Sequence, residues 1–86
     1  MEANIEIAQS LFKQNKHEET IDTCHAILTT DANSIEATKL IGKSFLAIRK
    51  INDARLYLQQ ALNIKPDDYE VIKDLGNTYQ AVGDIN

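Results

Sequence analysis

The feature that most constrains the fold is a repeat of 34 residues, which is clearest between Ile35 and Asp68. Apolar residues recur there at the three- to four-residue spacing of one helix face. They fall into two groups: Leu40, Ile41 and Phe45, then Ala54, Leu58, Ala61 and Leu62. A shift of 34 residues returns the same outline, so that Gly42 matches Gly76 downstream and Ala8 upstream. The chain is therefore predicted to be a helical repeat protein whose units bury their apolar faces on one another.

The period divides the chain into one all-α domain, residues 1–86, made of a repeat (1–34), a second repeat (35–68) and a partial repeat (69–86). Five helices are expected, with these approximate bounds: Glu2–Gln14, Glu18–Thr29, Ile35–Ile48, Asn52–Ile64 and Tyr69–Val82. Ser34 is a good N-cap for the third helix. Pro66 disfavours helical geometry at Lys65 and so ends the fourth.

This pattern resembles the tetratricopeptide repeat (TPR), a helix–turn–helix unit of 34 residues. The middle and last units carry the residues that the family favours: Ile41-Gly42, Phe45, Ala54, Leu58, Ala61 and Pro66, then Leu75-Gly76-Asn77, Tyr79 and Gly83-Asp84. The first unit departs from the pattern, with Ala8 for the glycine and Ile27 for a small residue. Arg49 stands at a turn where the family usually has Gly or Asn. The resemblance implies antiparallel helix pairs stacked as a short right-handed solenoid.

Composition excludes several classes of function. A formal net charge of −4 and a pI near 5.0 argue against nucleic-acid binding, which normally needs a basic face. A single cysteine, Cys24, rules out an internal disulfide. The first ten residues do not read as a signal peptide, and no apolar run reaches the ~20 residues of a membrane span. We expect a cytoplasmic protein that does not bind a membrane.

No catalytic, metal or cofactor-binding constellation is predicted. His17 and His25 have no second ligand at a helical spacing typical of zinc sites. Glu18 and Glu19 open a helix, where carboxylates interact favourably with its dipole. Cys24 lies on an apolar helix face, where packing is its expected role. The chain is therefore not expected to be an enzyme.

Binding residues are implied by the resemblance, because ligands of TPR arrays contact the first helix of each unit on the concave face. The matching residues selected here are Ile5, Gln9, Phe12, Lys13, Lys39, Lys43, Leu46, Lys73, Asn77 and Gln80. The expected partner is a protein or peptide. An acidic one would suit a stripe formed by Lys39, Lys43 and Lys73. The alternative is that these lysines pair with Glu36 and Glu70, three residues away.

One narrower TPR function is not expected. Some members hold the C-terminal carboxylate of heat-shock chaperones with a clamp of Lys, Asn and Arg. The matching positions here hold other residues: Ile5, Gln9, Leu40, Glu70 and Asp74. None of the five agrees with the clamp, and two reverse its charge.

The last helix raises a further question, because the chain ends partway through a unit. Val71, Leu75 and Val82 are expected to face the place where a partner helix would pack, which suggests either a fragment of a longer protein or a homodimer through this helix. The alternative is that the helix simply caps the stack. Three functions are therefore considered: a protein-interaction scaffold, a substrate-positioning segment of a larger enzyme such as a glycosyltransferase or methyltransferase, and a self-assembly element.

Overall fold

The computed structural model describes residues 4–83, with side chains as far as residue 80. All five expected helices are present and none of the described residues lies in a strand, so the predicted all-α architecture is confirmed. The helices are α1 (Ile5–Lys13), α2 (His17–Thr30), α3 (Ile35–Ala47), α4 (Ile51–Ile64) and α5 (Tyr69–Gly83). None of them has the length and apolar character that a membrane crossing requires.

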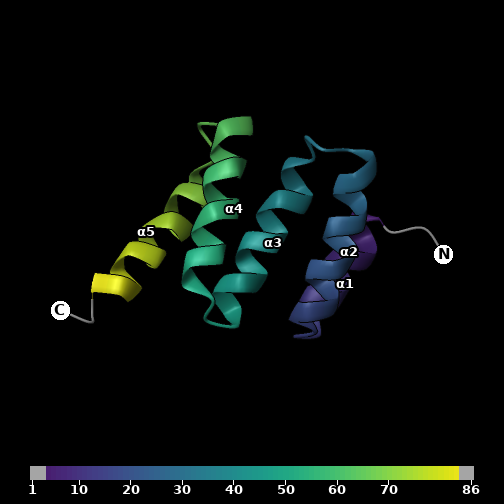
Figure 1. Cartoon of the computed structure of the whole chain (residues 1–86), viewed down its shortest axis with the longest axis horizontal. Helices are drawn as coiled ribbons and strands as arrows, with labels where there is room; N and C mark the ends of the chain where they lie inside the picture. Colours follow the sequence, from purple (N-terminus) through teal and green to yellow (C-terminus); the bar gives the residue numbers. More distant parts are fainter. Residues whose placement is uncertain (1–3, 84–86) are drawn as a thin grey trace.

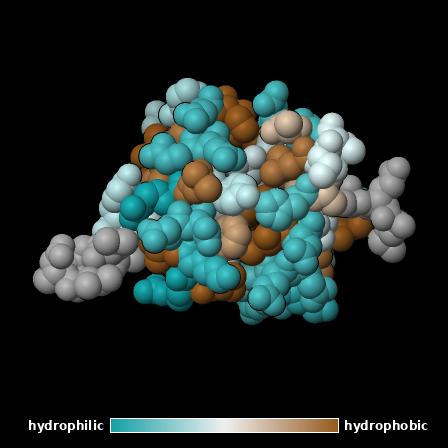
Figure 2. All heavy atoms as spheres, viewed as in Figure 1, coloured by the Kyte–Doolittle hydropathy of each residue, from teal (hydrophilic) through white to brown (hydrophobic). Residues whose placement is uncertain are grey.

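Consecutive helices run antiparallel and stack side by side into an elongated slab of 46 × 26 × 17 Å (Figure 1). The first helices of successive units also touch, α1 with α3 and α3 with α5, so that α3 packs against all four other helices. Hydrophilic residues cover most of the face seen in Figure 2, with apolar residues in small groups between them. This layered contact between neighbouring units is what the 34-residue period predicts.

The first helix of each unit begins at a polar N-cap. Asn4, Ser34 and Asp68 each accept a hydrogen bond from the backbone N–H three residues later, at 2.9, 3.2 and 3.2 Å. The helix N-terminus leaves such N–H groups without partners inside the helix, and these side chains satisfy one each. The sequence therefore fixes where α1, α3 and α5 start, and with them the register of the face they share. The start of α1 at Ile5 is later than the predicted Glu2.

The turn inside each complete unit contains a non-glycine residue in the left-handed conformation. Asn15 has φ of 63° and Arg49 has φ of 67°. At the second turn the N–H of Lys50 donates to the carbonyl of Phe45 at 2.9 Å, five residues back, as in a Schellman helix end. Both residues have a Cβ that crowds the backbone there, but Asn tolerates the conformation better than Arg because its short polar side chain can hydrogen-bond to the nearby backbone. Arg49, where related repeats usually have Gly or Asn, is therefore held in a conformation that is unfavourable for its side chain.

Replacing Arg49 with glycine is expected to stabilise the fold by about 1 kcal/mol, because glycine adopts φ near 67° without steric cost. Urea unfolding followed by circular dichroism would measure the gain. Asn15→Gly is the matched control in the other turn and should gain less, since asparagine is already suited to that conformation. Equal or negative changes for Arg49→Gly would show that its turn carries no strain.

The core consists of two clusters of buried side chains. One joins the first unit to the start of the second: Ala8, Ile21, Cys24, Ala37, Leu40 and Ile41. The other joins α4 to α5: Leu58, Ala61, Val71 and Leu75. At the crossing of α3 and α4, a Cβ on Gly42 would lie 2.8 Å from Leu58, so the glycine allows the close approach of these two helices. A Cβ on Gly76 would meet nothing within 4 Å among the described residues.

The prediction that Val71 and Leu75 lie on an exposed face of α5 is wrong. Val71 and Leu75 are buried against α4, with exposed fractions of 0% and 6%. Their counterparts one period earlier, Ala37 and Ile41, are buried too, because this face of each first helix packs against the preceding unit. Val82 lies outside the residues whose side chains are described.

The exposed face of α5 is formed by the residues that follow Val71 and Leu75, namely Ile72 and Gly76, together with Tyr79. Ile72 and Tyr79 are 43% and 55% exposed, and Gly76 between them is exposed as well. One period earlier the same face of α3 receives α4, at Gly42 and its neighbours. The apolar surface expected on the last helix therefore exists, but with different residues.

Candidate functional site

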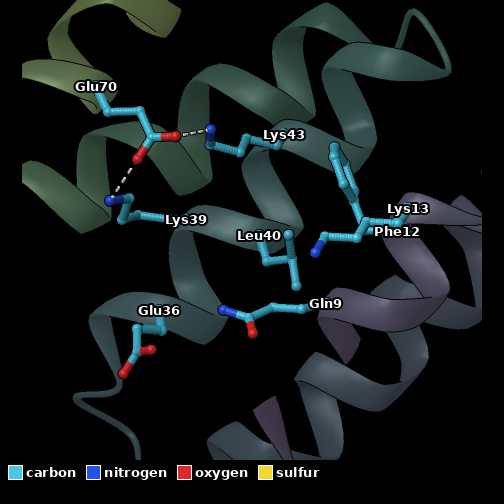
Figure 3. Close-up of a pocket in the computed structure, with 8 residues that line it drawn as sticks. All are labelled: Gln9, Phe12, Lys13, Glu36, Lys39, Leu40, Lys43 and Glu70. Carbon is cyan, nitrogen blue, oxygen red and sulfur yellow. Dashed lines mark hydrogen bonds and ion pairs between the residues drawn. The ribbon is translucent and has the colours of Figure 1, made fainter. Parts of the chain in front are cut away.

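A hollow of about 440 Å³ opens on the face that the first helices of the units share (Figure 3). Its lining comes from α1, α3 and α5: Gln9, Phe12, Lys13, Glu36, Lys39, Leu40, Lys43 and Glu70. The spacing of these residues along each helix is three or four, which places them on one side of it. No residue of α2 or α4 lines it.

The hollow combines an apolar part with polar surroundings. Phe12 and Leu40 supply the apolar surface between α1 and α3, and Gln9 and Lys13 add an amide and an ammonium on the α1 side (Figure 3). Lys13 is exposed and forms no ion pair within the part of the chain that the structure describes. A few polar groups around an apolar patch are typical of ligand-binding sites.

The structure brings half of the predicted binding residues together. The five that line the hollow are Gln9, Phe12, Lys13, Lys39 and Lys43, and the five that do not are Ile5, Leu46, Lys73, Asn77 and Gln80. Three lining residues, Glu36, Leu40 and Glu70, were not among the selected site residues. Leu40 and Glu70 occupy positions that match the chaperone-tail clamp without its residue types, and Glu36 and Glu70 are the acids that the alternative interpretation pairs with the lysines.

Two of the three lysines that line the hollow, Lys39 and Lys43, are paired with carboxylates of the next unit. Lys39 Nζ lies 2.8 Å from Glu70 Oε1 and 2.9 Å from Asp68 Oδ2. Lys43 Nζ pairs with Glu70 Oε2, so the two oxygens of one carboxylate bridge two ammonium groups (Figure 3). The predicted pairing of Lys39 with Glu36 is wrong, because the carboxylates of α5 reach it instead.

The period itself explains this choice of partner. Glu70 corresponds to Glu36 one unit earlier, and Lys39 and Lys43 correspond to Ile5 and Gln9. The carboxylate of the third unit therefore meets two lysines, whereas the residues in the corresponding positions for Glu36 are apolar (Ile5) and an amide (Gln9). The ion pairs of Glu70 are therefore found by comparing the first helix of one unit with the first helix of the next. Looking for partners three or four residues away within the same helix does not find them.

Asp68 uses its two oxygens for different purposes. Oδ1 accepts the N–H of Val71 at 3.2 Å and so caps α5, while Oδ2 binds Lys39 at 2.9 Å. The side chain is 9% exposed, so water competes little with either contact. The start of α5 and the position of Lys39 are thereby fixed by the same residue.

The pKa values of the network follow from these contacts. The hydrogen bond from Lys39 lowers the pKa of Asp68 below its usual value, against the opposing effect of burial. Hydrogen bonds from Lys39 and then Lys43 lower the pKa of Glu70. Partial burial alone would lower the pKa of Lys39, but its contacts with Glu70 and Asp68 outweigh burial and raise it. All three groups are charged at neutral pH.

Asp74 stands apart from these well-paired groups. Its Oδ2 is buried, lies 3.7 Å from Lys43 Nζ and forms no hydrogen bond with any of the described residues. Burial raises the pKa of this carboxyl, and the attraction of Lys43 only partly opposes that effect. Lys43 is thus closer to Glu70 than to Asp74, and its ion pair with Asp74 is the weaker one.

The residues considered for chemistry have packing roles in the structure. His17 contacts the ring of Phe12 and His25 that of Tyr57, with centroids 5.1 and 5.8 Å apart. Burial raises the pKa of the Cys24 thiol to about 11, which keeps it protonated and unreactive. No group of three or more metal-ligating side chains occurs in residues 4–80.

Two solved structures are similar to this chain. One is the first TPR of Spaghetti (RPAP3), bound to the HSP90 peptide SRMEEVD, with a TM-score of 0.85 and 20% identity over 88% of this chain and 60% of that one. The other is the NMR structure of the first TPR domain of human RPAP3, with a TM-score of 0.85 and 19% identity over 90% and 61%. The chain thus spans about three fifths of each. No protein-family model and no curated protein matches it.

Proposed function

Because the chain has the fold of a tetratricopeptide repeat domain, we propose that it is a non-catalytic protein-interaction scaffold that binds a peptide or helix on the face shared by α1, α3 and α5. The observation that carries the proposal is the hollow between α1 and α3, where Phe12 and Leu40 are flanked by polar groups. The two similar domains support it, since one of them is seen with a bound peptide. We place this binding in the cytoplasm, which suits a chain whose cysteine is a buried thiol.

The partner proposed is a protein segment with an apolar side chain and an acidic group. The apolar side chain would pack on Phe12 and Leu40, and Lys13, which has no ion pair among the described residues, would contribute to attracting the acidic group into the hollow. The remaining predicted residues would extend contact along α1, α3 and α5: Ile5, Leu46, Lys73, Asn77 and Gln80. The peptide SRMEEVD of the similar structure is not proposed as the ligand, because the clamp residues that hold chaperone tails are absent here.

The test is selection of binders from a phage-displayed library of random dodecapeptides, followed by fluorescence anisotropy of the enriched peptides. We expect them to lose roughly tenfold in affinity with Gln9→Ala combined with Lys13→Glu, because the loss of a polar contact and reversal of a charge together cost about 1.4 kcal/mol or more. Gln60→Ala combined with Lys16→Glu is the matched control away from the hollow. Peptides that lose affinity equally in both variants would place binding elsewhere.

A second candidate function, self-association, is favoured by the outward face of α5. Ile72, Gly76 and Tyr79 form an apolar stripe with a glycine at its centre, which permits close approach of another helix. Arg55 of α4 covers part of it by stacking over Tyr79, 4.4 Å from the ring centroid. We propose that a homodimer, if formed, uses this stripe.

Sedimentation equilibrium over a wide range of concentration tests the second candidate. A dimer that becomes a folded monomer with Ile72→Glu, but not with Leu56→Glu, would support it. Leu56 is a suitable control because it is 56% exposed on α4. A wild-type monomer at every concentration would exclude self-association and leave the hollow as the binding surface.

A further inference from the structure

One carboxylate in the hollow has the position that a ligand's acidic group would take. The carboxylate of Glu70 lies between Lys39 and Lys43, which are one helical turn apart on α3, and each of its oxygens contacts one of the two ammonium groups. Lys39 and Lys43 line the hollow with 20% and 24% of their side chains exposed. The two ammonium groups thus form an anion site that is already filled.

The three carboxylates around the lysines differ in how easily they can leave. Asp68 is held by its second oxygen at the start of α5, and Asp74 is mostly buried. The side chain of Glu70 is 52% exposed, and its carboxylate has no hydrogen-bond donor other than the two lysines among the described residues. A long exposed side chain can rotate into water at little cost, because surface ion pairs contribute little net stability.

We propose that Glu70 is an internal occupant of a carboxylate-binding site formed by Lys39 and Lys43, and that an acidic group of the partner binds there by displacing it. This inference rests on the proposed function, since it names the chemistry of one part of the same hollow. Asp68 stays in place when Glu70 leaves, because its cap to Val71 is independent of the hollow. Asp68 then still neutralises Lys39, whereas Asp74 at 3.7 Å offsets the charge of Lys43 only partly, so the site attracts a small acidic ligand rather than a long run of acidic groups.

Because Glu70 occupies the site, the hollow should prefer ligands that carry both an apolar and an acidic group over simple anions. The two lysines without Glu70 would not make this distinction. A carboxylate in free solution has to compete with Glu70, which is attached to the same molecule and is always close by. A partner whose apolar side chain is already seated against Phe12 and Leu40 presents its acidic group at a comparable effective concentration. The exchange thus selects ligands that combine both features over simple anions.

The experiment measures binding of succinate, a small dicarboxylate, to the whole chain by NMR of the lysine side chains. Glu70→Gln keeps the shape of the side chain and removes its charge. We expect succinate to shift the Lys39 and Lys43 Nζ signals, and to bind this variant with an affinity on the order of tenfold higher than the wild type. The reason is that the two ion pairs of Glu70, which compete with succinate for the lysines, are lost. Neutral succinamide should shift neither signal in either protein.

Glu6→Gln is the matched control, because Glu6 is also an exposed acid in the first turn of a first helix and its loss changes the net charge equally. Adding Lys43→Gln to Glu70→Gln should abolish the gain. Circular dichroism verifies folding, and Glu70→Ala provides a second variant with the same expectation. Equal succinate affinity in Glu70→Gln and Glu6→Gln, or a gain that survives Lys43→Gln, would overturn the inference.

The succinate experiment and the peptide selection can fail independently of each other. Peptides that bind the wild-type hollow, together with unchanged succinate binding in Glu70→Gln, would show that Glu70 is only a structural ion pair. Stronger succinate binding without any selected peptide would show the anion site and reject the peptide-binding function.

Discussion

Leu58→Ala is expected to lower the free energy of unfolding by about 3–4 kcal/mol, the largest loss from any single truncation considered. Leu58 is fully buried, fills the space over Gly42 and belongs to the cluster that joins α4 to α5. Truncation removes buried apolar surface and leaves a cavity that a close-packed neighbour cannot fill, and the two terms add. For a chain of 86 residues this is a large share of the total, which is about 4–13 kcal/mol.

Urea unfolding of Leu58→Ala beside Leu56→Ala provides the measurement. Leu56 lies on the same helix with 56% of its side chain exposed, so its truncation should change stability by about 0.5 kcal/mol or less. A similar loss in both variants would mean that α4 does not pack as described.

The two helical glycines are expected to respond to alanine with opposite signs. At Gly42 the new methyl group would lie 2.8 Å from Cγ and Cδ2 of Leu58, and the resulting overpacking should cost about 1–3 kcal/mol. At Gly76 the methyl group has no described atom within 4 Å, so the better helix propensity of alanine should stabilise the fold by about 1 kcal/mol. The difference between the two variants is therefore about 2–4 kcal/mol.

The double variant Leu58→Ala with Gly42→Ala identifies the cause. Once Leu58 is shortened, the methyl group at residue 42 has space, and Gly42→Ala should become neutral or stabilising in that background. The coupling energy in this double-mutant cycle is then favourable. Simple additivity of the two losses would show that the cost at Gly42 does not come from contact with Leu58.

Much of the fold could be predicted from the sequence because the 34-residue period is carried by short-range features. Helix faces, the polar N-cap at Ser34 and the stop at Pro66 are local, and the closeness of α3 and α4 follows from Gly42. The exposed face of α5 was predicted wrongly. Val71 and Ile72 are adjacent apolar residues, and only comparison with the buried Ala37 shows which of them faces the preceding unit.

The candidate site was less predictable than the fold. Sequence position places Gln9, Phe12 and Lys13 on the helix face that lines the hollow, since this depends only on helical spacing. The partners of Lys39 and Lys43 depend on how far α5 is displaced along α3 and on which rotamers reach across. Those quantities come from packing between units, and sequence spacing within one helix does not contain them.

The contact of α3 with all four other helices has a consequence for how the molecule opens. In a linear stack, a terminal element can detach while the rest keeps its contacts. Here α1 or α5 can separate at one end and leave a folded remainder, but no remainder survives without α3. The hollow is lined by α1, by α3 and by Glu70 of α5, so separation of α1 removes one whole wall of it before the domain itself has come apart.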